Sequence, residues 1–358
     1  MSRVARAIGS LKNALRSTTQ ILDVQRAALD HQHTLAITAV DGFFAGLGLP
    51  AERFRHCRFA TKKRLLDLYE HDVVYDRTVE DGCEFVDIKR DIRLFVPFSG
   101  FDEYVGLCWD VFVQGYGIAV RKPFIFIDIG SNLLNASLLF AQHPLCTRVF
   151  SYELIPSIHH LGLRNLAMNP RLQQKIDSHA FGLYNRTGDI DVTYYSSRSG
   201  ASGISEKLQE SEWLRTTMEV DFVDPQRRQQ LTVPVKEARN SLEVLIDGHP
   251  DDDIVIKVDA ENSEAEIIEN LSPVLDRVYC ISVELHSELG ARKVESMMSR
   301  ALYTMHRTAD NVSVFYRQAK ETSAAVWVNG LFALQFLAPA ADATIGSSLI
   351  SQLACLPV

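Results

Sequence analysis

Residues 124–139 read FIFIDIGSNLLNASLL, and the fold can be predicted from this stretch. An apolar run ends at Asp128-Ile129-Gly130, and a helical pattern of apolar residues begins within a few positions. A parallel strand that leads through a glycine turn into a helix has this pattern, and such turns hold nucleotides at the helix N-terminus. The stretch lacks the second glycine of G-x-G-x-x-G, which makes a dinucleotide-dependent oxidoreductase a weak interpretation.

From residue 124 onward, apolar strands alternate with helical segments. The expected strands are 124–130, 147–154, 175–183, 253–260 and 278–286, and the expected helices between them are 135–142, 157–169 and 263–276. Continuous apolar strands separated by helices predict a mostly parallel sheet that is covered on both faces. Ligands bind beyond the carboxyl ends of such strands, where the strand order reverses. The turn after Asp128 is expected at that edge.

The segments around this alternation predict further elements. Residues 183–250 are longer than a crossover requires, and DIDVTYYSSRSGASGIS within them predicts a hairpin and a Ser/Gly loop that could act as a lid. Residues 83–97 predict a β-hairpin and 102–117 an amphipathic helix. The uncharged segment 324–341 contains proline and polar residues, so it predicts buried strands rather than a membrane span.

Residues 1–82 are expected to form an α-helical N-terminal region. A heptad stripe runs through its first part, made of Val4, Ile8, Leu11, Leu15, Leu22 and Leu29. The stripe could pack within its own domain, form a subunit contact or, least favoured, anchor the chain peripherally at a membrane. We expect residues 1–45 to mediate a homo-oligomer. A basic helix follows at 52–71, either a solvated face or a phosphate-binding surface.

Composition limits the class of protein. Hydrophobic residues make up 46% and charged residues 23% of the 358 positions, which is typical of a soluble globular chain. The formal net charge of -8 argues against a nucleic-acid-binding protein. The six cysteines form no CxxC pair, which indicates a reducing cytoplasm rather than disulfides or a zinc site. The N-terminus lacks the apolar core of a secretory signal, so we expect a cytoplasmic protein.

Acidic residues follow the first two strands of the alternation. Gly130 could adopt a backbone conformation closed to other residues, and Asp128 lies at the strand tip beside it. Glu153 ends the second strand about twenty residues after Gly130, where an acid accepts hydrogen bonds from ribose hydroxyls. The alternative for Glu153 is an exposed carboxylate at the start of a helix. Together the two acids favour a nucleoside-bearing cofactor.

A second group of polar residues follows the last two strands. Asp259 and Glu261 come directly after an apolar strand, where acids need solvent, a ligand or a metal. Glu284 and His286 are two residues apart, so their side chains share one side of the strand. A histidine beside a carboxylate could be a general base, although single histidines are often structural. The acids could hold a divalent metal, but no ligand spacing demands one, and none is predicted.

Five stretches of the chain resemble the FkbM-type S-adenosylmethionine-dependent methyltransferases, in order and over residues 90–310. They are FIDIGSN, SYELIPSIHHLGLRNLAMN, FGLYNRTGDIDVTYYSSRSGASGIS, IKVDAENSE and VELH. The resemblance implies a class I methyltransferase fold, Rossmann-like and doubly wound, with seven mostly parallel strands and one reversed strand. It implies a methyltransferase domain at 83–358, with the insertion or lid at 183–250.

The resemblance also implies roles for individual residues. The cofactor-binding residues would be Asp128, Gly130, Ser131, Asn132 and Glu153. The substrate-binding residues would be Lys257 and Glu284, and the catalytic residues Asp259, Glu261 and His286. Two positions depart from the family pattern, because Leu134 and Asn262 stand where the family has glycine. Leu134 could crowd the methionine end of the cofactor or pack harmlessly between sheet and helix.

The function that the resemblance implies is O-methyl transfer from S-adenosylmethionine to a hydroxyl of a saccharide or glycoconjugate. The protein would align the acceptor oxygen with the methyl group, and Asp259, Glu261 or His286 would remove the acceptor proton. Its partners would then be a small molecule or a glycan. The alternative is a non-catalytic scaffold with a methyltransferase fold, which the two replaced glycines and the heptad stripe motivate. A glycosyltransferase is a further possibility without a recognisable motif.

Overall fold

The computed structural model describes residues 42, 45, 57–196, 199–205, 228–307 and 311–318. The chain divides into two compact units, residues 1–62 with 336–358 and residues 63–335, and all the described strands belong to the second. The heptad stripe and the expected strands at 324–341 lie outside the described residues. The homo-oligomer therefore stays a prediction. No helix in the described part of the chain is long and apolar enough to cross a membrane.

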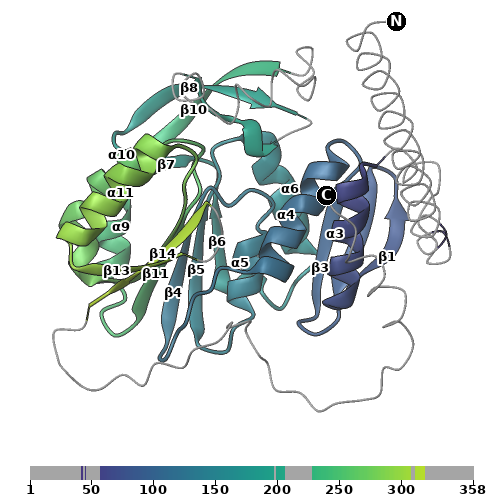
Figure 1. Cartoon of the computed structure of the whole chain (residues 1–358), viewed down its shortest axis with the longest axis horizontal. Helices are drawn as coiled ribbons and strands as arrows, with labels where there is room; N and C mark the ends of the chain where they lie inside the picture. The colour runs from purple at the N-terminus through teal and green to yellow at the C-terminus, as the bar shows by residue number, and fades with distance from the viewer. Residues whose placement is uncertain are drawn as a thin grey trace, which may run out of the picture. The chain divides into compact units, whose positions relative to one another are not determined.

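Seven strands form the central sheet, in the order β13-β14-β12-β11-β4-β5-β6 (Figure 1). They are β4 (Phe124–Ile129), β5 (Cys146–Tyr152), β6 (Ile176–His179), β11 (Asp253–Val258), β12 (Val278–Glu284), β13 (Tyr303–Arg307) and β14 (Val312–Arg317). β14 is antiparallel to both of its neighbours, and all other neighbouring pairs are parallel. The predicted fold is confirmed: a doubly wound sheet of the class I methyltransferase type with one reversed strand.

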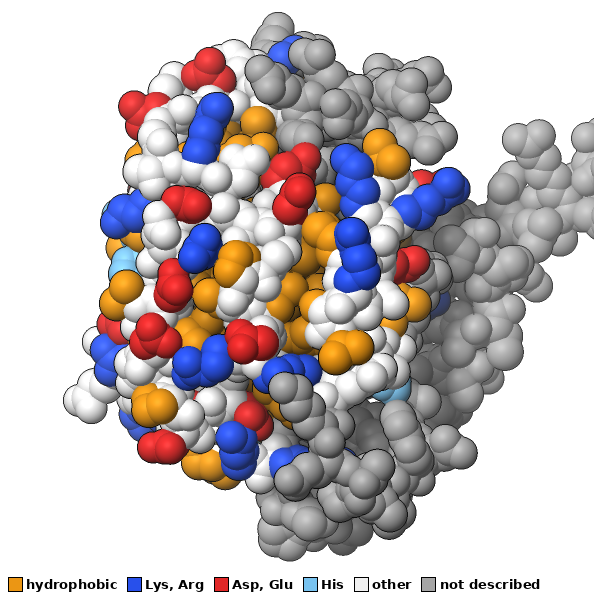
Figure 2. Space-filling view, turned by 90° about the vertical axis from the view of Figure 1, so that its left-hand side faces the viewer, with side chains coloured by type: hydrophobic (Ala, Val, Ile, Leu, Met, Phe, Trp, Pro, Cys, Tyr) orange, Lys and Arg blue, Asp and Glu red, His pale blue; other side chains and the backbone are white. Residues whose placement is uncertain are grey.

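Helices cover both faces of this sheet (Figure 1). One face carries α4 (Phe101–Trp109), α5 (Asn135–Ala141) and α6 (Pro156–Ala167), and the other carries α9 (Ala238–Asp247), α10 (Glu264–Leu271) and α11 (Glu288–Arg300). Alternate strand residues supply each core. Ile127 and Ile256 pack with Leu242 of α9 on one face, and Phe126 stacks on Phe140 of α5 on the other. Figure 2 shows charged side chains of both signs, with apolar ones between them, on the outer surface of the α9–α11 side.

A three-stranded antiparallel sheet precedes the central one. It contains β1 (Val73–Val79), β2 (Gly82–Asp87) and β3 (Ile92–Pro97), after the helix α3 (Phe59–Glu70). The hairpin predicted at 83–97 is confirmed as β2 and β3. The boundary expected at residue 82 falls at the first residue of β2, and residues 73–79 of the part expected to be helical form a strand. Residues 73–79 form a strand because their backbone pairs with β2, whose edge would otherwise be open.

A four-stranded sheet is inserted between β6 and β11. Its strands are β7 (Gly182–Tyr184), β8 (Gly188–Tyr195), β9 (Gly203–Ile204) and β10 (Arg228–Glu237), in the order β7-β10-β8-β9. The strand expected at 175–183 is therefore divided between two sheets, as β6 and the start of β7. The insertion ends before α9 rather than at residue 250, because Ala238, Leu242 and Ile246 of α9 are buried against the central sheet.

Candidate functional site

A cavity of about 360 Å³ lies at the carboxyl ends of β4, β5, β11 and β12, at the edge predicted for the ligand. Residues from α4, from the inserted sheet and from the π-helix η1 (Asp110–Gln114) complete its wall. The predicted site residues that line it are Gly130, Ser131, Asn132, Glu153, Lys257, Asp259, Glu261, Glu284 and His286. Residues up to 156 positions apart in the sequence therefore meet in one small-molecule-sized space.

The turn after β4 depends on a residue without a side chain at position 130. Gly130 has φ +77°, and a Cβ atom built on it would lie 1.8 Å from the carbonyl oxygen of Asp259. The backbone N–H groups of Gly130 and Ser131 donate to the carbonyl oxygen of Tyr152 at 3.0 and 3.1 Å. The turn is therefore held against both neighbouring strand ends, and only glycine fits there.

Leu134 does not line the cavity. Its side chain is 1% exposed and packs toward α6, where a Cβ atom on Gly162 would lie 3.0 Å from Leu134 Cγ. Leu134 could have crowded the cofactor or packed between sheet and helix. It packs against the helix and leaves the cofactor space open. Its φ of +64° is left-handed and costs a leucine roughly 1–2 kcal/mol. Asn262, the other replaced glycine, has φ +73°, a conformation that asparagine tolerates better than most residues.

Glu153 is buried between the turn and the start of α6. Its side chain accepts hydrogen bonds from the backbone N–H groups of Asn132 (2.9 Å) and Ile155 (2.8 Å), and the residue is 5% exposed. Burial raises the pKa of this carboxyl group to about 7, although both N–H groups act in the opposite direction. The exposed helix-start carboxylate considered for Glu153 is thus wrong.

Asp128 lies beneath the cavity, fully buried, rather than in its wall. Its two oxygens contact Ser137 Oγ at 2.6 Å and Lys257 Nζ at 3.2 Å. Lys257 Nζ also donates to the Gly130 carbonyl oxygen at 2.9 Å and lies 3.4 Å from Asp259. Burial acts to lower the pKa of Lys257, but the charges of Asp128 and Asp259 outweigh it and keep the pKa well above its usual value. A charged lysine therefore joins the ends of β4 and β11.

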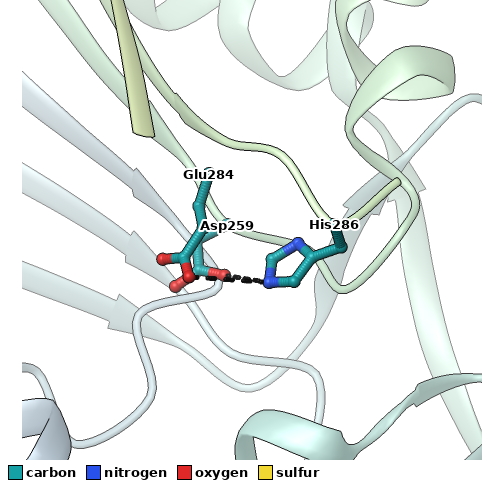
Figure 3. A group of neighbouring side chains, drawn as sticks. All are labelled: Asp259, Glu284 and His286. Carbon is teal, nitrogen blue, oxygen red and sulfur yellow. Dashed lines mark ion pairs between the residues drawn. The ribbon is translucent and has the colours of Figure 1, made fainter. Parts of the chain in front are cut away.

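His286 is the centre of a carboxylate cluster at the other end of the cavity, and Figure 3 shows it pointing toward Asp259 and Glu284. Its Nε2 lies 3.5 Å from Glu261, 3.7 Å from Glu284 and 3.9 Å from Asp259. Burial acts to lower the pKa of His286, but the negative charges of Glu261 and Glu264 raise it well above its usual value. Burial raises the pKa of Glu284 to about 7 and that of Glu261 well above its usual range.

Glu264 fixes the orientation of this histidine. Its Oε1 accepts hydrogen bonds from the backbone N–H groups of Ala260 and Asn262, both at 3.1 Å, and lies 2.9 Å from His286 Nδ1. Because Glu264 Oε1 accepts hydrogen bonds, His286 Nδ1 must be the donor in the contact between them. Nε2 is then the ring nitrogen that faces the cavity. Glu264 belongs to the stretch IKVDAENSE, which resembles the FkbM-type enzymes, and it also suits the first turn of a helix. Its contact with His286 could not be predicted from either property.

The sequence did not single out Ser199, which lines the cavity, or Glu103, which contacts it. Ser199, in the 3₁₀-helix η3 (Ser199–Ala201) of the insertion, accepts a hydrogen bond from Asn132 Nδ2 at 3.1 Å. Its Oγ donates to Glu103 of α4 at 2.9 Å. The insertion thus contacts the turn after β4 directly, and its function as a lid stays a prediction. No motif or spacing links residues this far apart.

No protein-family model matches the sequence, and no curated protein matches it. Solved structures resemble it in fold. The methyltransferase FkbM from Methylobacillus flagellatus KT matches 61% of this chain with 12% identity and a TM-score of 0.36, and the match spans 53% of FkbM. M. capricolum TrmK in complex with S-adenosyl-homocysteine gives 9% identity and a TM-score of 0.28, over 57% of this chain and 69% of TrmK. A SAM-dependent O-methyltransferase from Thermotoga maritima gives 10% identity and a TM-score of 0.27, over 57% of this chain and 63% of that protein.

Proposed function

We propose that this protein transfers a methyl group from S-adenosylmethionine to a hydroxyl group of a saccharide or glycoconjugate. The observation that carries the proposal is the single cavity that contains both the glycine turn with Glu153 and the cluster around His286. The turn and Glu153 are the parts that doubly wound folds use for a nucleoside. The cluster offers groups that can accept a proton. The order of the motifs along the chain, which resembles the FkbM-type enzymes, favours a saccharide acceptor.

The cavity wall near the turn fits the cofactor. Glu153 would accept hydrogen bonds from the ribose hydroxyls, and Gly130 leaves space for the amino-acid part. Ser131 Oγ, Asn132 Oδ1 and Asn135 Oδ1 are buried there without a hydrogen-bond partner among the described residues. Buried polar atoms are normally paired, and an ammonium and a carboxylate group would pair with these three.

When bound, S-adenosylmethionine supplies a methyl group on a positively charged sulfur, so that an O–C bond forms on the acceptor while the S–C electron pair stays on sulfur. The side chains of this protein have two tasks. Asn311 and the carboxylates around His286 provide hydrogen-bond partners for acceptor hydroxyls. The acceptor proton passes to Glu261 or Asp259, which face the same space. His286, predicted as a third candidate, is a poor acceptor because the surrounding carboxylates hold its pKa well above the usual value.

Glu153→Ala should weaken the binding of S-adenosylhomocysteine at least about tenfold, because the partner of two ribose hydroxyls is lost. The wild-type affinity should also fall as the pH decreases through about 7, since the neutral acid is a poorer acceptor than the carboxylate. Isothermal titration at several pH values measures both effects. The pH dependence should be absent from Glu153→Ala, and Glu243→Ala on the exposed face of α9 is the control. Equal affinities for all three proteins would refute the cofactor site.

Glu261→Gln, Asp259→Asn and His286→Gln should each lower kcat at least about tenfold, within the usual range for general-base catalysis. The dissociation constant for S-adenosylhomocysteine should change little, because none of the three is the ribose partner. Single-turnover methyl transfer to a panel of saccharides is the measurement. If Glu261→Gln, Asp259→Asn and His286→Gln all retain full turnover, the proton acceptor lies elsewhere.

One of the two arguments for a non-catalytic scaffold, the replacement of two glycines, is weakened. Leu134 packs away from the cavity, and Asn262 adopts a left-handed conformation that asparagine tolerates better than most residues. A scaffold need not bind the cofactor, so the titration above distinguishes the two functions.

A further inference from the structure

Three potential metal ligands converge in the cavity from the ends of two neighbouring strands. Asp259 follows β11, whereas Glu284 and His286 lie at the end of β12, and one ligand atom of each lies within 4.8 Å of the other two (Figure 3). We propose that these three side chains bind a divalent cation. Two carboxylates and one imidazole suit a first-row ion such as Mn²⁺ better than Ca²⁺, which prefers oxygen ligands alone.

Each ligand is held in place by a residue outside the triad. His286 Nδ1 donates to Glu264, which leaves Nε2 directed toward the carboxylates. Glu284 Oε1 accepts a hydrogen bond from Asn311 Nδ2 at 2.7 Å, and Asp259 Oδ2 lies 3.4 Å from Lys257 Nζ. Metal-binding histidines almost always donate their second N–H to a carboxylate or carbonyl in this way, and the outer partner sets the tautomer and the ring orientation.

The centre of the cluster has polar atoms without hydrogen bonds. Nε2 of His286 is 3.5–3.9 Å from three carboxylates, and none of these contacts is a hydrogen bond. Ser263 lines the same cavity, is 2% exposed, and its Oγ has no hydrogen-bond partner in the part of the chain that the structure describes. A hydrated cation would supply both a partner for Nε2 and water molecules for the hydroxyl group.

The charges around the cavity also lack balance. Five carboxylates belong to this network, and the described residues offer it two cationic groups, Lys257 and His286. The carboxylates are those of Asp128, Asp259, Glu261, Glu264 and Glu284. Clustered acids are costly in a partly buried site unless opposite charge accompanies them. A divalent cation would supply the missing charge at the point where the three ligand atoms meet.

The role of the cation rests on the proposed function, whereas its binding does not. Beside the acceptor, it would lower the pKa of the hydroxyl group that is to be methylated. Glu261 is not needed as a ligand and would remain free to accept the proton.

Titration of the full-length protein with Mn²⁺, with free Mn²⁺ measured by electron paramagnetic resonance, tests the site. We expect one saturable site that is at least about tenfold weaker in Glu284→Gln and in His286→Gln. The matched control is Glu269→Gln, in a second acidic hollow that Glu237 and Glu266 line without a histidine. Circular dichroism and thermal unfolding establish that each variant is folded.

Two results would overturn the proposal: no saturable site in the wild-type protein, or equal Mn²⁺ affinities in the wild type, Glu284→Gln and His286→Gln. Glu153→Ala separates this proposal from the proposed function, because it should lose S-adenosylhomocysteine and keep Mn²⁺. If the wild-type protein binds Mn²⁺ but no cofactor, the metal site is supported and the proposed methyltransferase function is refuted.

Discussion

Lys257→Met should lower the free energy of unfolding by about 3–5 kcal/mol, the usual effect of removing one partner from a buried ion pair. The Lys257 side chain is 6% exposed, and its Nζ lies 3.2 Å from Asp128 and 3.4 Å from Asp259. Asp128 is completely buried, so without the lysine its charge would have only Ser137 as a partner. Methionine fills much of the same volume, which leaves the loss of charge as the main effect.

Urea unfolding at neutral pH measures this effect. Lys293→Met is the matched control, because Lys293 is exposed on α11, and it should change stability by less than about 0.5 kcal/mol. The double variant Lys257→Met, Asp128→Asn should recover part of the loss, because the unpaired charge is removed. A loss below about 1 kcal/mol in Lys257→Met would mean that the buried lysine is not the link between the two strand ends.

Gly130→Ala should lower the free energy of unfolding by about 2–5 kcal/mol. The loss has two causes, the strain of a side chain on a left-handed backbone and overpacking. The new Cβ would lie 1.8 Å from the Asp259 carbonyl oxygen, a backbone atom that cannot rotate away. The ends of β4 and β11 would have to separate, so binding of S-adenosylhomocysteine should be lost as well.

The chain offers a control that separates strain from overpacking. Gly115 has φ +66°, and no atom lies within 4 Å of an added Cβ. Gly115→Ala should therefore cost only the conformational strain of a backbone with φ +66° and ψ -178°, about 1–3 kcal/mol, and leave ligand binding intact. Equal losses of stability in the two variants, measured by urea unfolding, would show that the contact with Asp259 does not matter.

The sequence was informative where a residue's role depends on its own strand. Asp128, Glu153, Lys257 and Glu284 are all polar residues at the ends of apolar runs, and parallel strands bring such ends to one edge. Their proximity could therefore be predicted without knowing any contact. The helices between them were found for the same reason, since their apolar periodicity is local.

The remaining features depend on contacts between distant segments. The link from Asn132 through Ser199 to Glu103 joins three elements whose spacing carries no pattern. The triad of Asp259, Glu284 and His286 requires that β11 and β12 be neighbours in the correct register. The division of residues 175–183 between two sheets likewise reflects pairing with β10, which lies about fifty residues further along.

The packing of Leu134 against Gly162 has a consequence for how such chains are recognised. The space that a glycine normally leaves open in the turn is provided here from the facing helix, by a residue 28 positions later. The leucine side chain in the turn thus fits because the facing helix residue has no side chain. A search pattern that demands every glycine within the turn will overlook chains of this kind, and one that scores the two positions as a pair will find them.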